Sequence, residues 1–124
     1  MCFVSQLLGG DVNKLWKSGG GKPFPLPLAK RILLHTLRGI HHAHLSGVVH
    51  TDIKHDNIFF DAGLSNEQIS ELLNADPPRT HPPEQSIDGI VQAAVSQPLP
   101  VPSWTDALDR TFVLADFGNG MRTA

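Results

Sequence analysis

Cysteine is almost absent from this sequence, and its scarcity narrows the classes of protein that the chain can represent. Cys2 is the single cysteine among 124 residues. The chain therefore has neither a disulfide framework nor a set of thiolates for a zinc site. Proteins without disulfides are typical of reducing compartments, so the cysteine content favours the cytoplasm and/or the nucleus.

Excess positive charge and long apolar runs are also lacking. The formal net charge is −2 and the pI is near 6.3, which gives no basic field of the kind that attracts nucleic acid or anionic lipid. The opening MCFVSQLLGGDV has no basic start, and no apolar run is long enough for a signal peptide or a membrane span. We expect a soluble chain with one core at most and no direct nucleic-acid or membrane partner.

A phosphate-binding loop is lacking too, although GGGK resembles part of one. The pattern G-x-x-x-x-G-K-[ST] needs glycine where Trp16 stands and a hydroxyl residue where Pro23 stands. Residues 1 to 27 instead begin apolar, reach Gly9 and Gly10, and continue into KSGGGKPFPLP. This pattern predicts a short strand, a turn at the two glycines and then a connector.

The sequence does contain one well-marked helix, from residue 28 to residue 46. Pro27 suits a first helical turn, and Gly47 suits the position just after the last one. Apolar residues recur between them at helical spacing, namely Leu28, Ile32, Leu33, Leu37, Ile40 and Leu45. We predict a core helix of about five turns that needs partners on more than one side.

Four histidines on this helix raise an alternative, a histidine-rich metal-dependent hydrolase. They are His35, His41, His42 and His44. A zinc site needs three or four converging ligands, and this helix carries no carboxylate or cysteine to complete such a set. Roles in packing or at the solvent-facing surface are therefore preferred.

Residues 61 to 110 are predicted to be a proline-rich insertion. SNEQISELLN holds a capping box, Ser65 with Gln68, ahead of apolar residues at helical spacing, which predicts one short helix. Seven of the ten prolines lie between Pro77 and Pro102, which favours an extended loop with one helical turn around GIVQAAV. A tolerated surface insertion is preferred over a dedicated binding segment.

The stretch VVHTDIKHDNIFF places polar chemistry between two apolar runs. Its polar residues fit the pattern H-x-D-x-K-x-x-N, and a strand IFF follows. Beyond the insertion, residues 112 to 115 predict a buried strand that ends in D-F-G at Asp116. Both motifs in this order, behind a long helix, resemble the catalytic core of the eukaryotic protein kinases.

The resemblance implies an α+β fold, a partial protein kinase domain over residues 1 to 124. Its parts would be a hinge strand at Val4 to Leu7, the long helix of the large lobe, the catalytic loop and two short strands separated by the insertion. His44 matches the histidine that precedes the catalytic loop in that family. The implied cofactors are ATP and Mg²⁺, and the implied partner is a protein substrate.

The same resemblance assigns roles in phosphate transfer. Asp52 would orient the substrate hydroxyl and accept its proton, and Lys54 would reach the γ-phosphate oxygens. Asn57 and Asp116 would supply oxygen ligands to Mg²⁺. The implied nucleotide-binding positions are Ser5, Gln6, Leu7 and Phe59, the last at the floor of the adenine site.

Thr51 and Asn119 indicate which group of protein kinases the chain resembles. HTDIK and DFGN are similar to the SR-protein kinases, which implies Arg/Ser-rich splicing factors as substrates and an activity that does not depend on loop phosphorylation. Three residues depart from that pattern. His55 stands where proline is usual, Asp56 where glutamate is usual, and Phe117 where leucine is usual.

Several parts of a kinase core are missing from the 124 residues, which contain no glycine-rich strand of the kinase type, no V-A-x-K lysine and no A-P-E. We therefore expect a serine/threonine kinase segment that is truncated at both ends and inactive alone, which leaves open whether the chain is an enzyme. The alternative is a non-catalytic kinase-like fragment, either an interaction module or a gene relic. The oligomeric state also stays open.

Overall fold

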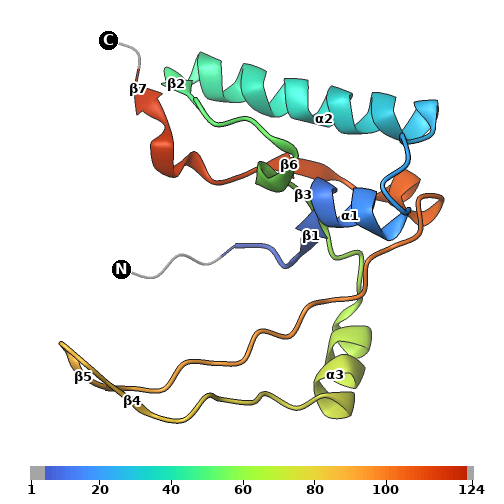
Figure 1. Cartoon of the computed structure of the whole chain (residues 1–124). Coiled ribbons are helices and arrows are strands. Elements are labelled where there is room, and N and C mark those ends of the chain that lie inside the picture. Colours follow the sequence, from blue (N-terminus) through green and yellow to red (C-terminus); the bar gives the residue numbers. More distant parts are fainter. Residues whose placement is uncertain (1–4, 123–124) are drawn as a thin grey trace. The chain divides into compact units, whose positions relative to one another are not determined.

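The computed structural model describes residues 5 to 122, which mix helices and strands in an α+β arrangement (Figure 1). The chain divides into two compact units. The first unit holds the described residues up to Gly63 and from Leu99 onward, and the second holds Leu64–Pro98. Val4 of the expected hinge strand lies outside the described residues.

The centre of the first unit is a three-stranded antiparallel sheet in the order β1-β3-β6. Its strands are β1 (Leu8–Asp11), β3 (Ile58–Asp61) and β6 (Phe112–Leu114). Side chains alternate across a strand, and in β3 this alternation buries Ile58 and Phe60. The strands predicted from IFF and from residues 112 to 115 are both present, the second one residue shorter than expected.

The first strand differs from its prediction. Residues 5 to 7 are not a strand, and Gly9 with Gly10 lies inside β1 rather than at a turn. The Phe60 ring explains the glycine, because a Cβ at Gly9 would lie 2.7 Å from the Phe60 Cε2 atom. The glycines thus let β1 approach a large core side chain, a purpose that the local sequence does not reveal.

Helix α1 (Val12–Ser18) was not expected, because only a short strand, a turn and a connector from Lys17 onward were predicted in this region. The Asp11 carboxylate caps the helix by accepting a hydrogen bond from the Lys14 backbone N–H at 2.7 Å. Val12 and Leu15 are buried in the core. The sequence did not indicate this helix because it is short and glycines follow it. Short helices of this kind depend on tertiary packing for their stability.

Helix α2 (Leu26–Leu45) confirms the predicted long helix. Gly47, just beyond it, has φ of +68°, the left-handed conformation that glycine adopts at little cost. Its buried residues are Leu28, Ile32, Thr36 and Ala43.

Of the six apolar residues that indicated a core helix, only Leu28 and Ile32 are buried. Leu33 and Leu37 are each 61 % exposed and Leu45 is 74 % exposed. The buried residues form a stripe along one face of α2, and this face packs on β6. Leu33, Leu37 and Leu45 lie outside that stripe and are exposed.

The core of the first unit joins α1, α2, the sheet and a segment that was assigned to the insertion. Trp104 donates a hydrogen bond from Nε1 to the Leu15 carbonyl at 3.0 Å, and its ring meets Phe24 edge-on. Ala107, in the short 3₁₀ helix Asp106–Asp109, is fully buried. Residues 99 to 110 therefore pack as part of the first unit, although the sequence placed them in the insertion.

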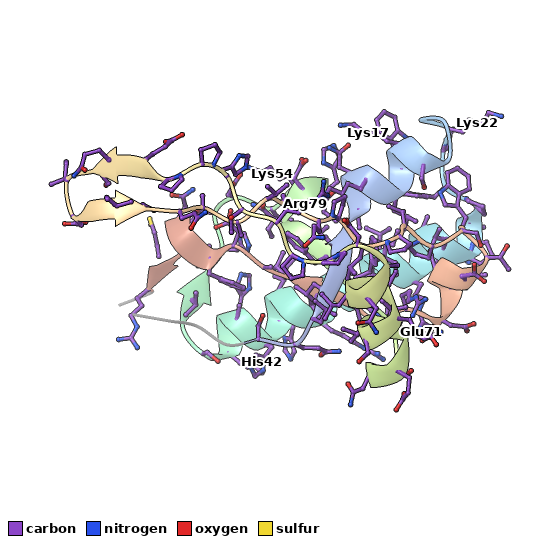
Figure 2. The ribbon with its side chains drawn as sticks, turned by 90° about the horizontal axis from the view of Figure 1, so that it is seen from below. Lys17, Lys22, His42, Lys54, Glu71 and Arg79 are labelled. Atoms are coloured by element: carbon purple, nitrogen blue, oxygen red, sulfur yellow. The ribbon has the colours of Figure 1, made fainter. Side chains whose placement is uncertain are left out.

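The second unit, Leu64–Pro98, has little buried surface. Helix α3 (Asn66–Ala75) begins with the predicted capping box, and its side chains, Glu71 among them, project from the ribbon (Figure 2). The helical turn predicted around GIVQAAV is wrong, because β4 (Glu84–Ser86) and β5 (Gly89–Val91) form a hairpin there. Asp88 and Gly89, at φ of +113°, supply the turn chemistry that favours a hairpin.

Candidate functional site

Two segments of the first unit form the candidate site. The loop from His50 to the 3₁₀ turn His55–Asn57 connects the two-residue strand β2 (Val48–Val49) to β3. The second segment follows β6 and runs through the 3₁₀ turn Phe117–Asn119 to β7 (Met121–Arg122). β2 pairs with β7, so the two segments meet at that pair as well as at β3 and β6.

The side chains of Lys54 and Asn57 both donate hydrogen bonds to Asp52. The Lys54 ammonium donates to Asp52 Oδ2 at 2.7 Å. The Asn57 amide donates to the same oxygen at 3.1 Å and to the Asp52 backbone carbonyl at 2.9 Å. The structure thus brings together three of the residues that the H-x-D-x-K-x-x-N spacing singled out.

This contact sets the charge of the cluster. The hydrogen bond from Lys54 lowers the pKa of the Asp52 carboxyl, and the bond from Asn57 lowers it further. The hydrogen bond that Lys54 donates to Asp52 raises the pKa of Lys54, and the charge of Asp116 contributes in the same direction. Asp52 is therefore ionised and Lys54 protonated at neutral pH, and Asp116 is close enough to influence the lysine.

His50 connects the loop to the end of β6. Because a carbonyl can only accept, its Nε2–H donates to the Ala115 carbonyl at 2.8 Å, and its Nδ1 accepts from the Asp52 backbone N–H at 3.3 Å. These two bonds assign a ring hydrogen to Nε2 and an acceptor role to Nδ1. The ring also packs against Phe117, with the ring centroids 4.5 Å apart.

Asp116 follows β6 in an unusual backbone conformation. Its φ is +61°, in the left-handed region that aspartate tolerates better than most residues. Ala115, the residue before it, donates its backbone N–H to the Asn57 carbonyl at 2.9 Å. The backbone therefore anchors Asp116 beside Asn57.

The donor set of Asn57 and Asp116 fits a hard divalent cation. Both amide hydrogen bonds of Asn57 use Nδ2, which leaves Oδ1 as an acceptor with no hydrogen bond among residues 5 to 122. Mg²⁺ prefers oxygen ligands and is often held by one or two protein groups together with phosphates. Two carboxylates, Asp52 and Asp116, outweigh the one ammonium of Lys54, so the site also has the sign of charge that attracts a cation.

The predicted nucleotide positions are only partly brought to this site. Phe59 is half-buried in β3, where it pairs with Val113 and Asp11. Ser5, Gln6 and Leu7 are exposed, and within residues 5 to 122 no hydrogen bond joins their side chains to the Asp52 cluster. Leu7 instead accepts a hydrogen bond from the Ala62 backbone at 3.3 Å, at the end of β3.

The histidines of α2 serve other purposes. His35 accepts a hydrogen bond from the Phe112 backbone N–H at Nδ1, 2.9 Å away, and burial together with Arg31 and Arg38 lowers its pKa. His42 is exposed on α2 (Figure 2). Within residues 5 to 122 no three histidine, cysteine or acidic side chains are placed to hold a metal ion.

A cavity of about 720 Å³ opens between α2 and β6, away from the polar cluster. Arg38, Gly39, Leu114 and Phe117 are among its lining residues, whereas Asp52, Lys54, Asn57 and Asp116 are not.

In the part of the chain that the structure describes, no helix is both long and apolar enough to cross a bilayer.

Two further connections of the loop were not predicted. The Asn13 amide on α1 donates to Asp56 Oδ1 at 2.8 Å, and His55 pairs with the other oxygen of that carboxylate at 2.6 Å. Thr51 Oγ1 donates to the Asn119 carbonyl at 2.8 Å. The departures His55 and Asp56 were visible in the sequence, but Asn13 and the Asn119 carbonyl lie too far along the chain from this loop for a local pattern to reveal these contacts.

Comparison with known proteins places the chain near the protein kinases. No family profile matches it. It is 37 % identical over 59 residues to the mitogen-activated protein kinase hog1 of Aspergillus terreus and, at the same identity, to the mitogen-activated protein kinase sakA of Aspergillus fumigatus. It is 39 % identical over 56 residues to hog1 of Botryotinia fuckeliana.

The matches are partial. They cover 45 to 48 % of this chain and 15 % of each relative, so the chain matches only about a seventh of the length of these kinases. The similarity supports a segment of a eukaryotic serine/threonine protein kinase domain. The relatives are named as mitogen-activated kinases, and the likeness to SR-protein kinases is not supported by them.

Proposed function

We propose that this chain is a segment of a serine/threonine protein kinase in which Asp52, Lys54, Asn57 and Asp116 carry phosphate transfer from ATP to a protein hydroxyl. The observation that carries the proposal is the hydrogen bonding of Asp52 with both Lys54 and Asn57, in a loop that is itself bonded to Ala115, the residue between β6 and Asp116. The kinase relatives support the same reaction class.

Phosphate transfer requires that the reacting groups are positioned and that the phosphate charge is neutralised. Asp52 is ionised and half-exposed, so its carboxylate is able to orient a hydroxyl and accept its proton. The Lys54 ammonium lies beside that carboxylate and offers a cation to the phosphate oxygens. Asn57 and Asp116 would hold Mg²⁺, which neutralises phosphate charge in this reaction class.

We expect the 124 residues alone to transfer phosphate too slowly to measure. Positioning of the nucleotide supplies most of the rate in this reaction, and the sequence contains neither a glycine-rich strand of the kinase type nor a V-A-x-K lysine. A phosphate-binding charge contact is typically worth on the order of 10² to 10³ in rate. We therefore expect transfer only when a kinase that contains these parts supplies them.

The test is a chimera. The 124-residue chain replaces the matching segment of the Aspergillus terreus hog1 kinase, and transfer of radiolabelled phosphate is compared for the chimera, for Asp52→Asn and for Asp88→Asn. We expect Asp52→Asn to lower kcat by about 10² to 10⁴, the usual contribution of a general base. Asp88, exposed at the hairpin turn of the second unit, is the matched control. A folded chimera whose activity survives Asp52→Asn would contradict the proposal.

The finer proposal concerns the substrate, which we place among Arg/Ser-rich proteins. Its support is the sequence pair Thr51 and Asn119, and the names of the relatives do not add to it. The same chimera is assayed on an Arg-Ser repeat peptide and on a generic basic peptide. Equal rates on the two peptides would show that this substrate class is wrong while leaving the kinase assignment intact.

A second candidate function is a non-catalytic interaction module. The exposed leucines of α2, Leu33 and Leu37 among them, favour this candidate, because apolar side chains that gather on a surface mark a site for contact with another protein. A chimera that folds and binds a protein partner but shows no transfer would support this candidate instead.

A further inference from the structure

We infer that Thr51 is a positioning residue whose hydroxyl latches the Asp116 segment onto the catalytic loop without any phosphate group. The inference rests on the proposed function, since it concerns how Asp116 and Asp52 are held in one site. The latch is the hydrogen bond from Thr51 Oγ1 to the Asn119 carbonyl, 2.8 Å long, which joins residues 68 positions apart.

The backbone of Thr51 shows that this position is tightly determined. Its φ is +64°, and for a β-branched residue the left-handed region is a genuine outlier. Such conformations are energetically costly and persist only where surrounding contacts impose them. The hydroxyl bond is one such contact, and the buried His50 next to it supplies another through the Ala115 carbonyl.

The Thr51 latch fixes the far side of Asp116. On the near side, Ala115 is bonded to both His50 and Asn57. Beyond Asp116 comes the 3₁₀ turn Phe117–Asn119, whose residues are exposed. Among the hydrogen bonds of residues 5 to 122, the one from Thr51 is the side-chain bond that reaches this turn. Asp116 is thus held on both sides, and beyond it the Thr51 bond acts together with the packing of Phe117 on His50 and the pairing of β2 with β7. Removal of the hydroxyl therefore weakens the hold on this side.

The chemistry of the latch has a regulatory meaning. Both of its groups are neutral, and the acceptor is a backbone carbonyl, so the bond needs neither a charged partner nor a covalent modification. A latch made by a cation and a phosphate opens whenever the phosphate is removed. The Thr51 latch needs no phosphate, so the hydrogen bond to Asn119 holds the Asp116 segment in the unmodified chain.

The experiment compares amide hydrogen exchange, followed by mass spectrometry, in the full 124-residue chain and in three variants. Thr51→Val keeps the β-branched shape and loses the hydroxyl. Thr51→Ser keeps the hydroxyl, and Asn119→Ala keeps the backbone acceptor. One net hydrogen bond predicts exchange over residues 116 to 122 roughly two- to tenfold faster in Thr51→Val, with Thr51→Ser and Asn119→Ala close to the parent and α2 unchanged in all three.

Two results would overturn the inference. One is equal exchange in Thr51→Val and Thr51→Ser, and the other is faster exchange that extends over α2, which would indicate a global loss of stability. If circular dichroism shows that Thr51→Val does not fold, Thr51→Ala, which lacks both the hydroxyl and the branch, replaces it with the same expectation.

A second readout links the latch to Asp116. In the hog1 chimera, Thr51→Val should raise the Mg²⁺ concentration for half-maximal transfer by about two- to tenfold, and Thr51→Ser should restore it. An unchanged Mg²⁺ requirement would overturn the positioning role. The exchange measurement does not depend on activity, so an inactive chimera with a functioning latch would count against the proposed function alone.

Discussion

At the residue scale, the polar cluster of Asp52, Lys54 and Asn57 is held together by few side chains. Asp52 receives bonds from one lysine and one asparagine, both within five positions along the chain. That short interval is why the sequence could predict the cluster, since a motif fixes the relative places of residues that share one loop. His50 extends the cluster to Ala115 through a contact that no local pattern contains.

The first residue-scale prediction concerns the charge of Asp52. Lys54→Met removes the hydrogen bond that lowers the pKa of Asp52, so we expect this pKa to rise toward its ordinary value. Because the folded-state pKa lies below the unfolded value, the interaction with Lys54 is fully present above the unfolded pKa and is lost as the pH falls through the folded pKa.

Carbon-detected NMR titration of the Asp52 carboxyl measures this change directly. Lys22→Met, which alters an exposed lysine of the loop before α2, is the matched control. An Asp52 titration that is the same in Lys54→Met and in the parent would show that the contact between the two side chains does not form in solution.

At the element scale, helix α2 has two different sides. Its buried stripe packs on β6 and fills the core with Leu28 and Ile32, while Leu33 and Leu37 face away. The sequence predicted the helix, and it placed the two ends within two residues of those observed because proline marks one end and glycine the other. It did not predict which leucines are buried, because apolar residues lie around most of the helix and spacing alone does not choose a face.

A pair of substitutions on this helix tests the assignment of its faces. Leu28→Ala, at a side chain that is 1 % exposed, should lower the free energy of unfolding by about 2 to 5 kcal/mol through lost burial and the cavity left behind. Leu33→Ala, at a side chain that is 61 % exposed, should change it by about 0.5 kcal/mol or less. Urea unfolding followed by circular dichroism measures both, and similar losses would mean that Leu33 is covered in solution.

At the scale of the whole molecule, buried side chains gather in one of the two units. The buried hydrophobic and polar residues of the described chain all belong to the first unit, and none lies in Leu64–Pro98. The sequence predicted the loose character of this region from its prolines. It missed the hairpin, and it missed the return of the chain to the core at Trp104 and Ala107, because a contact between residues 89 positions apart leaves no local trace.

This difference in burial predicts where the chain opens first. Segments with few buried contacts open at low free energy, so thermolysin should cut between residues 77 and 98 before it cuts α2. Ile87 and Ile90, exposed at the hairpin, are the expected sites. First cuts within residues 30 to 45, identified by mass spectrometry, would contradict the division into a packed unit and an open one.

The contact of Gly9 with Phe60 has a consequence for how this sequence can change over generations. No side chain fits at position 9 while the aromatic ring occupies its present place, and a smaller residue at position 60 would leave space that glycine cannot fill. Each position therefore sets what the other tolerates, and a change that is harmful at one becomes acceptable after a matching change at the other. We therefore expect substitutions at these two positions, 51 residues apart in the chain, to occur together.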